Sequence, residues 1–115
     1  MEVRNTKFTQ KYTKVFCEDS WNYNAPHHFK VETVDGNEIG QINFQEGPIK
    51  ECGINGVNNE DLLLMVLTRL EAFQTSQYRC IENQQAIDAI NEAIDSLRKR
   101  TNKRINRGVE GTSKV

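Results

Sequence analysis

The sequence predicts an α+β fold: a small antiparallel β-sheet in the N-terminal half, packed on two C-terminal α-helices. Before Asn58, short runs of alternating apolar and polar residues are separated by turn-forming residues, which is typical of strands. After Asn58, apolar residues recur every three or four positions over two long stretches, which is typical of amphipathic helices. A chain of 115 residues is expected to form a single domain, residues 1–115.

Four stretches of the first half are predicted to be strands: residues 3–15, 28–34, 38–44 and 49–54. Asp35-Gly36 is typical of a two-residue hairpin turn, because glycine accepts positive φ without strain. Gly40 interrupts the third stretch and indicates a β-bulge. Gly47-Pro48 is expected to turn the chain before the fourth. Residues 18–26, which include the only tryptophan, Trp21, are expected to be irregular.

The first helix is expected to begin at a cap formed by Asn58 and to end near residues 74–77. Its apolar residues cover more than one side: Leu62, Leu63, Met65, Val66, Leu67, Leu70 and Phe73. The second helix is expected to begin near residues 80–83 and to end at Gly108. Its buried stripe is predicted to contain Ala86, Ile87, Ala89, Ile90, Ala93, Ile94 and Leu97. Since a small domain has a modest core, the wide apolar surface favours an oligomer.

A run of basic residues closes the second helix. Arg100, Arg104 and Arg107 are spaced so that their guanidinium groups share one face, with Lys103 beside them and Arg98 and Lys99 pointing elsewhere. Like charges at this spacing repel, and a phosphate-bearing ligand would relieve the repulsion by accepting two hydrogen bonds from each guanidinium. Glu110, between two glycines, is expected to accept from ribose hydroxyls or to hold an arginine.

Phe73 and Asn83 are candidates for recognising a nucleobase. Phe73 lies at the end of the first helix, where its ring can stack on a base. Asn83 lies at the start of the second helix, where its amide can hydrogen-bond a base edge. An antiparallel helix pair would place both residues at one end and the arginines at the other, so that a symmetric dimer would be needed to unite them.

Each of these features also has a purely structural interpretation. A basic helix end can be a solvated face that complements the helix dipole, Phe73 can be a core residue, and Asn83 can be a helix cap. The adjacent His27 and His28 and the three scattered cysteines indicate no metal site, and the thiols are expected to be reduced. No set of residues predicts catalysis, and no cofactor is expected.

Global properties exclude further classes of protein. No stretch approaches the roughly 20 apolar residues of a membrane helix, and residues 1–16 lack a signal-peptide core, so a cytoplasmic location is expected. The net charge of −1 argues against a general nucleic-acid binder. The alternatives left open are a small nucleic-acid-binding module and a protein-interaction module that uses the basic end of the second helix.

Three blocks of sequence resemble the phage Thoeris anti-defence one family: FQEGPIKE from Phe44, NGVNNEDLL from Asn55 and RINRGVEGT from Arg104. Cys80 and Glu82-Asn83 fit the same pattern, and the resemblance spans residues 29–112. It implies a non-enzymatic protein that binds and sequesters cyclic ADP-ribose isomers made by bacterial TIR-domain sensors. Some members also bind cyclic di- or trinucleotides of CBASS signalling at a separate site.

The resemblance also implies a set of ligand-binding residues and an assembly. It matches an aromatic residue, an asparagine and two arginines of the family's pocket to Phe73, Asn83, Arg100 and Arg104, with Arg107 and Glu110 as secondary candidates. It implies a homo-oligomer, namely a dimer that assembles further into a hexamer. It assigns no residues to the site for cyclic oligonucleotides.

Overall fold

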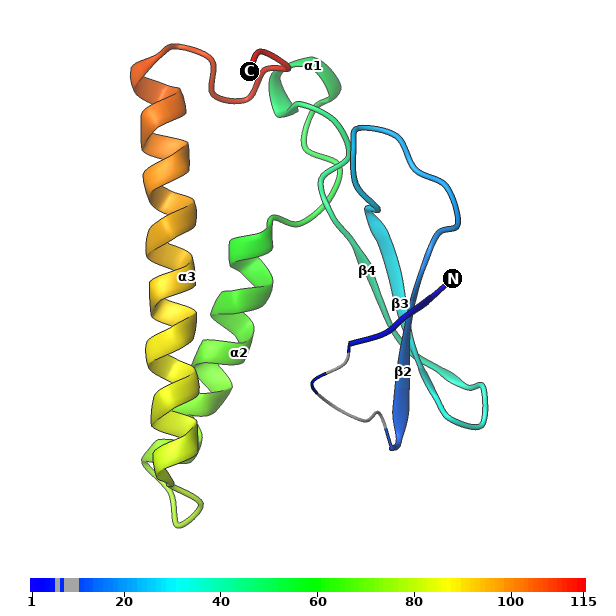
Figure 1. The fold of residues 1–115 in the computed structure, drawn as a ribbon, viewed down its shortest axis with the longest axis vertical. Coiled ribbons are helices and arrows are strands. Elements are labelled where there is room, and N and C mark those ends of the chain that lie inside the picture. Colours follow the sequence, from blue (N-terminus) through cyan, green and yellow to red (C-terminus); the bar gives the residue numbers. More distant parts are fainter. Residues whose placement is uncertain (6, 8–10) are drawn as a thin grey trace. The chain divides into compact units, whose positions relative to one another are not determined.

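A computed structural model describes residues 1–5, 7 and 11–115 of the chain. These residues form two compact units, Met1–Val57 and Asn58–Val115, which correspond to the two compositional halves of the sequence (Figure 1). The first unit contains an antiparallel sheet and the second contains two long helices, so the predicted α+β class is confirmed. The single binding domain and the packing of the sheet on the helices stay predictions. Among the described residues, none of the helices is long and apolar enough to cross a membrane.

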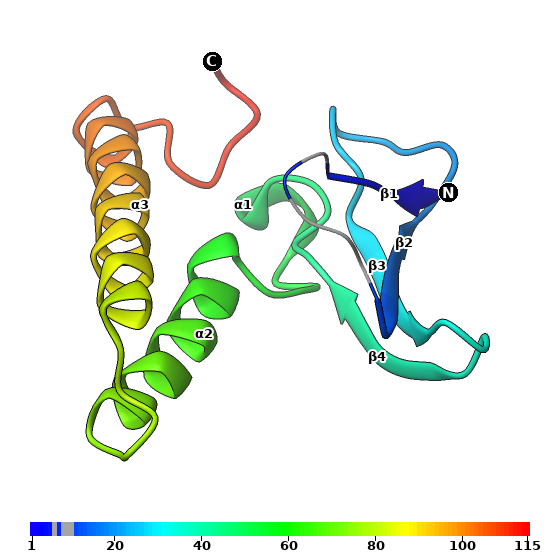
Figure 2. The ribbon, with the colours of Figure 1, turned by 60° about the horizontal axis from the view of Figure 1, so that its bottom comes forward.

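The sheet has four strands in the order β1-β2-β3-β4, with every neighbouring pair antiparallel (Figure 2). The strands are β1 (Glu2–Val3), β2 (Thr13–Cys17), β3 (His28–Thr33) and β4 (Glu38–Asn43). β1 and β2 replace the single predicted strand over residues 3–15, and Phe8 from that stretch lies outside the described residues. β2 extends beyond Val15 because Phe16 and Cys17 pair with β3, where Cys17 is buried.

The β3–β4 hairpin confirms the predicted turn but changes its type. The Thr33 N–H donates to the carbonyl of Asn37, which leaves residues 34–36 as a three-residue loop instead of the predicted two-residue one. Gly36 closes this loop at a φ of 94°, where a side chain would be strained. The predicted bulge is also present, because the pairing shifts from Val31–Gly40 to Glu32–Glu38 and leaves Ile39 unmatched.

The predicted fourth strand, residues 49–54, is wrong: the chain forms the short helix α1 (Ile49–Cys52) there. Pro48 has no N–H for a strand ladder, and its carbonyl accepts from the N–H of Cys52 at 2.7 Å. The Gly53 N–H continues this helical pattern by donating to Ile49. The apolar alternation that indicated a strand has no buried face to support it, since Ile54 is 84% exposed.

The segment around α1 is closed by side-chain hydrogen bonds between its two ends. The Asn55 N–H donates to Gln45 Oε1 at 3.0 Å, and the Glu46 N–H donates to Asn55 Oδ1 at 2.8 Å. Next to these hydrogen bonds, Phe44 and Val57 form an isolated parallel β-bridge. Gly56 lies against that bridge, and a Cβ added there would come within 2.4 Å of the Phe44 carbonyl.

The second unit is an antiparallel helical hairpin made of α2 (Asn59–Gln74) and α3 (Ile81–Asn106), which lie side by side in Figures 1 and 2. The predicted ends of both helices are confirmed. The Asn58 N–H donates to the Asp61 carboxylate at 2.8 Å, and the Cys80 sulfur accepts from the N–H of Asn83 at the start of α3. Gly108, at a φ of 72°, follows the last turn of α3.

The core of the helical hairpin is narrow. Leu67 of α2 and Ile87 of α3 are each 7% exposed and are the only apolar residues within the described parts of these two helices that count as buried. Elsewhere on α2, Leu64 and Met65 are each 57% exposed. The predicted wide apolar surface of the first helix is therefore present, and the oligomer that it favours stays a prediction.

We expect Gly56→Ala to destabilise the first unit by about 2 kcal/mol or more, because the new methyl group would meet backbone atoms that cannot move aside. Urea unfolding followed by the fluorescence of Trp21, which lies in this unit, measures the effect. The control is Gly40→Ala, whose Cβ would meet only the Val31 side chain at an ordinary 3.9 Å. Equal midpoints for the two variants would contradict the prediction.

The His28 imidazole is expected to stabilise the first unit most at low pH. A hydrogen bond to Asn43 (2.9 Å) and another to Glu46 (2.8 Å) raise the His28 pKa above its ordinary 6.5. Charged His28 therefore contributes fully below pH 6.5, and the contribution is lost as the pH rises through the folded-state pKa. In an NMR titration, Glu46→Gln should lower this pKa, whereas Glu60→Gln in the second unit should not. An unchanged pKa in Glu46→Gln would refute this assignment.

Candidate anion-binding site

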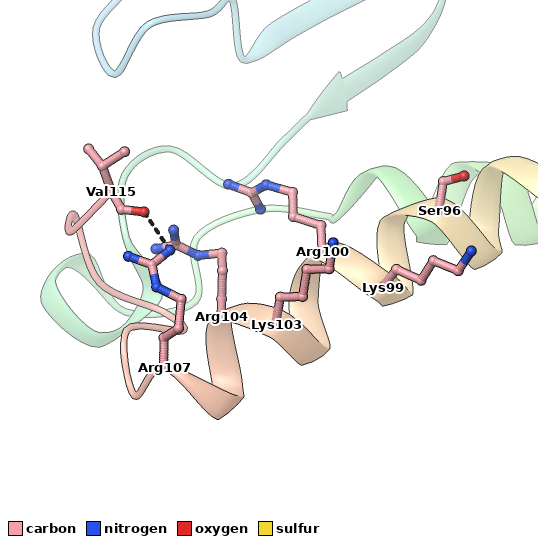
Figure 3. A pocket seen from close by; sticks show the side chains of 7 residues that line it. All are labelled: Ser96, Lys99, Arg100, Lys103, Arg104, Arg107 and Val115. Atoms are coloured by element: carbon pink, nitrogen blue, oxygen red, sulfur yellow. Dashed lines mark hydrogen bonds between the residues drawn. The ribbon is translucent and has the colours of Figure 1, made fainter.

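The C-terminal third of α3 carries an open groove of about 540 Å³, within the size range of small-molecule sites. We call it the basic groove; its lining residues are Ser96, Lys99, Arg100, Lys103, Arg104, Arg107 and Val115 (Figure 3). The three predicted arginines thus share one face of the helix. Lys99, which was expected to point elsewhere, lines the groove as well. It lies one turn before Lys103, and its long side chain reaches the same surface.

Arg104 binds the segment that follows the helix. Its Nη2 lies within hydrogen-bond distance of the carbonyl oxygens of Val109 (3.0 Å), Thr112 (3.1 Å) and Lys114 (2.9 Å), so that its two hydrogens are shared among three acceptors. These three bonds fold residues 108–115, which we call the tail, back toward the helix end. The Nε and Nη1 groups of Arg104 have no hydrogen-bond partner in the part of the chain that the structure describes. Arg104 therefore has a structural role on one side and retains donors on the other.

Arg107 also contacts the tail, with its Nη1 donating to the main-chain oxygen of Val115 at 2.9 Å (Figure 3). Val115 itself is 97% exposed, so this contact depends on the hydrogen bond and not on burial of the side chain. Two of the three predicted arginines are thus engaged by main-chain oxygen atoms in the free protein.

Lys99, Arg100 and Lys103 have no hydrogen-bond or ion-pair partner among the described residues, and no acidic residue lines the basic groove. Five cationic side chains therefore share one surface that no described acidic side chain lines. Their mutual repulsion is relieved when an anion binds, and guanidinium and ammonium groups together provide many donors to phosphate oxygens. The groove is chemically suited to a ligand that carries two or more negative charges.

The tail begins with an anchored turn. The Val109 N–H donates to the carbonyl of Arg104 at 3.0 Å, and the Val109 side chain is buried. Glu110 follows, but within the described residues the groove arginines bond to carbonyl groups and not to its carboxylate. The expectation that Glu110 holds an arginine is therefore wrong, because the turn presents the carbonyls of its neighbours instead. Its contact with a ribose stays a prediction.

Phe73 and Asn83 lie at the other end of the helical hairpin. The Phe73 ring is 39% exposed, and Arg69 lies over it with Cζ 5.5 Å from the ring centroid. The Asn83 amide donates through Nδ2 to the carbonyl of Tyr78 at 3.3 Å. Its Oδ1 has no partner among the described residues and remains an acceptor for a base amine. The alternative role of Phe73 as a core residue is wrong, because its side chain is exposed at the end of α2. Asn83 contributes to the start of α3, where its N–H donates to the capping Cys80 sulfur.

The structure does not bring these residues together with the arginines in one chain. Asn83 is in the first turn of α3 and Arg104 in the last, about 30 Å apart at the helical rise of about 1.5 Å per residue. Arg100, Arg104 and Arg107 form one part of a site, while Phe73 and Asn83 form another. This separation agrees with the expectation that one chain is insufficient.

Two components of the groove were missed by sequence reasoning. Lys99 could have been found from its spacing of four residues to Lys103. The carbonyl groups of the tail could not, because any residue type presents the same main-chain oxygen. No group of three or more His, Cys, Asp or Glu side chains in the described ranges could hold a metal ion.

Comparison with known proteins identifies the family. No family model matches the chain. The chain is 40% identical, over an alignment of 137 residues, to the protein named Thoeris anti-defense 1 of Bacillus phage SBSphiJ7, and the alignment covers 96% of each chain. This similarity extends through both the sheet and the helical hairpin, so the chain belongs to the Thoeris anti-defense 1 family.

Proposed function

We propose that this protein counteracts Thoeris immunity by binding and sequestering a cyclic ADP-ribose isomer, without cleaving it. One observation carries the proposal: the basic groove presents three cations without a partner among the described residues and no acidic side chain, in a member of an anti-defence family. A cyclic ADP-ribose isomer has a pyrophosphate, two riboses and a base. Its pyrophosphate supplies the negative charge that the groove lacks.

Arg100 is the best placed residue to bind the pyrophosphate. Its guanidinium has no partner among the described residues, so both of its donor edges are available to phosphate oxygens. Lys99 and Lys103 flank it and add point charges. Arg104 contributes one edge only, since its Nη2 is engaged by the tail. In this assignment Arg100 contributes most to affinity and Arg107 is secondary.

The base would be recognised at the other end of the hairpin. Phe73 offers a half-exposed ring for stacking, which typically contributes about 1–3 kcal/mol per base. Arg69 already lies over this ring, so the base would stack on the opposite face or displace the arginine. Asn83 offers the Oδ1 acceptor, which matches the exocyclic amine of adenine.

A symmetric dimer would unite the two parts of the site. In a two-fold dimer, any contact that one subunit makes with its partner is repeated in reverse, so two equivalent sites form at once. Phe73 and Asn83 of one subunit would then face Arg100 and Arg104 of the other. The exposed apolar residues Leu64 and Met65 of α2 are available for such an interface.

Sequestration requires affinity and no catalytic group. The described lining of the basic groove contains lysines, arginines, one serine and one valine, with neither a histidine nor an acidic side chain to activate a nucleophile. Stoichiometric capture of a messenger needs nanomolar affinity, or about −12 kcal/mol. Several desolvated guanidinium–phosphate bonds and one stacked base are a sufficient source of this free energy after the ordering costs are subtracted.

We expect Arg100→Gln to weaken binding of a cyclic ADP-ribose isomer roughly 10- to 100-fold, because it removes charged hydrogen bonds. Thermal stability should stay unchanged, since Arg100 has no partner in the described fold. Isothermal titration measures the affinity, and chromatography of heat-released ligand shows whether it is intact. The matched control is Arg98→Gln, the same change at an exposed residue outside the groove. Equal affinities in the two variants, or cleaved ligand, would refute the proposal.

Mixing two defective variants tests whether the site is shared between subunits. Phe73→Ala and Arg100→Gln should each bind poorly as uniform oligomers. A mixed dimer, co-expressed and purified through two different tags, should regain about half of its sites, because one of its two sites then receives only unaltered residues. Titration of the mixed dimer measures the number of tight sites. If mixing recovers none, the site is not divided between subunits in this way.

A further inference from the structure

The side-chain amide of Asn55 closes the segment around α1, residues 45–57, by pairing with the main chain of a single residue. Its Oδ1 accepts from the Glu46 N–H at 2.8 Å, and its Nδ2 donates to the Glu46 carbonyl at 2.8 Å. The Asn55 N–H adds a third hydrogen bond, to Gln45 Oε1 at 3.0 Å. The side chain at this position must therefore donate and accept at once, which an amide does and a carboxylate does not.

The next residue, Gly56, is required by close packing. A Cβ at this position would overlap the carbonyl group of Phe44 and come within 2.7 Å of the carbonyl oxygen of Asn43. These main-chain atoms are held by β4 and by its bridge to Val57, so they cannot move aside. The fold therefore requires an asparagine followed directly by a glycine.

Asparagine followed by glycine is the pair in which an asparagine side chain deamidates most readily. The main-chain nitrogen of the second residue attacks the amide carbon of the first, and glycine has no side chain to hinder the attack. Asn55 is exposed, and it is the one asparagine of the sequence that precedes a glycine. The Gly56 N–H has no hydrogen-bond partner among the described residues, so its nitrogen is not held by another group.

The reaction needs no reactant other than water. The Gly56 nitrogen loses its proton and bonds to Asn55 Cγ, while Nδ2 takes up a proton and leaves as ammonia. Water then opens the cyclic imide at one of its two carbonyl groups, which yields aspartate or isoaspartate. The departure of Nδ2 removes the donor to the Glu46 carbonyl, so this hydrogen bond must break before the product forms.

We propose that Asn55 is a modification site, where spontaneous deamidation irreversibly opens residues 45–57. The hydrogen bonds to Glu46 slow the reaction in the closed segment, and it proceeds in the fraction of molecules whose segment is transiently open. In the product, a carboxylate oxygen replaces Nδ2 and faces the Glu46 carbonyl oxygen. Two acceptors at that distance repel each other, so the segment does not close again. The loss of ammonia makes the change one-way.

Peptide mapping by mass spectrometry tests the modification itself. One sample of the unaltered chain is kept folded at mildly alkaline pH, and a second is kept unfolded in urea. In the folded sample we expect severalfold more deamidation at Asn55 than at any other asparagine. In urea the reaction at Asn55 should be severalfold faster, because the hydrogen bonds to Glu46 are lost. No preference for Asn55 in the folded sample, or equal rates in the two samples, would overturn the proposal.

The variant Asn55→Asp carries the side chain of the aspartate product and tests the opening of the segment. We expect trypsin to cleave after Lys50, an exposed residue of α1, severalfold faster in this variant than in the unaltered chain. The matched control, Asn58→Asp, adds the same charge at the cap of α2, where aspartate is an equally good cap, and should be cleaved at the unaltered rate. Equal cleavage of the two variants would contradict the opening.

Fluorescence of Trp21 during urea unfolding shows whether the first unit of Asn55→Asp still folds. If it does not, the deamidated form of the unaltered chain, separated by ion exchange through its additional negative charge, takes the place of the variant. The same severalfold faster cleavage after Lys50 is expected, and cleavage at the rate of the unmodified form would refute the opening. Neither measurement involves a ligand, so both outcomes are independent of the proposed function.

Discussion

The candidate site depends on the hydrogen bonds from Arg104 to three main-chain carbonyls of the tail. These bonds turn the end of α3 from a simple basic helix terminus into a folded groove, with the tail as one of its borders. They also fix the orientation of the guanidinium, so that one edge faces the tail and the other is free. A substitution of Arg104 would remove both a ligand donor and the organiser of the tail, and loss of binding alone could not separate the two. Arg100, which has no such structural task, is the informative position.

No acidic side chain in the described parts of the chain lines the basic groove to balance its positive charge. Five ion pairs join residues of the first unit, between Met1 and Glu46. The first unit therefore pairs several of its charges, whereas Lys99, Arg100 and Lys103 at the basic end of α3 have no ion-pair partner among the described residues. Such an arrangement is unfavourable for the folding of an isolated domain, because like charges repel in the native state. It is favourable for capture of an anion, since binding both relieves the repulsion and forms charged hydrogen bonds.

The sequence predicted those features that depend on side-chain pattern. The alternation in residues 28–34, the cap at Asn58, the helix end at Gly108 and the shared face of Arg100, Arg104 and Arg107 are all present. The side-chain pattern gave a wrong prediction where main-chain hydrogen bonds determine the secondary structure. Residues 49–54 alternate like a strand, but the carbonyls of Pro48 and Ile49 accept from residues four positions later and make a helix. The hydrogen bonds from Arg104 to the tail could not be predicted for the same reason, since every residue type has the main-chain oxygen that accepts them.

The length of α3 limits what one chain can do. A helix of 26 residues spans roughly 39 Å, longer than a single nucleotide messenger, so residues at its two ends cannot contact the same small ligand. If Phe73 and Asn83 bind a base, the phosphates of that ligand need cations other than those of their own basic groove. A second copy in the opposite orientation provides them, and the same two-fold relation repeats the site. In that case the ligand can bind only to the oligomer. The core of the hairpin, with Leu67 and Ile87 as its buried apolar residues among those described, agrees with a helix pair whose remaining apolar surface is completed by a partner.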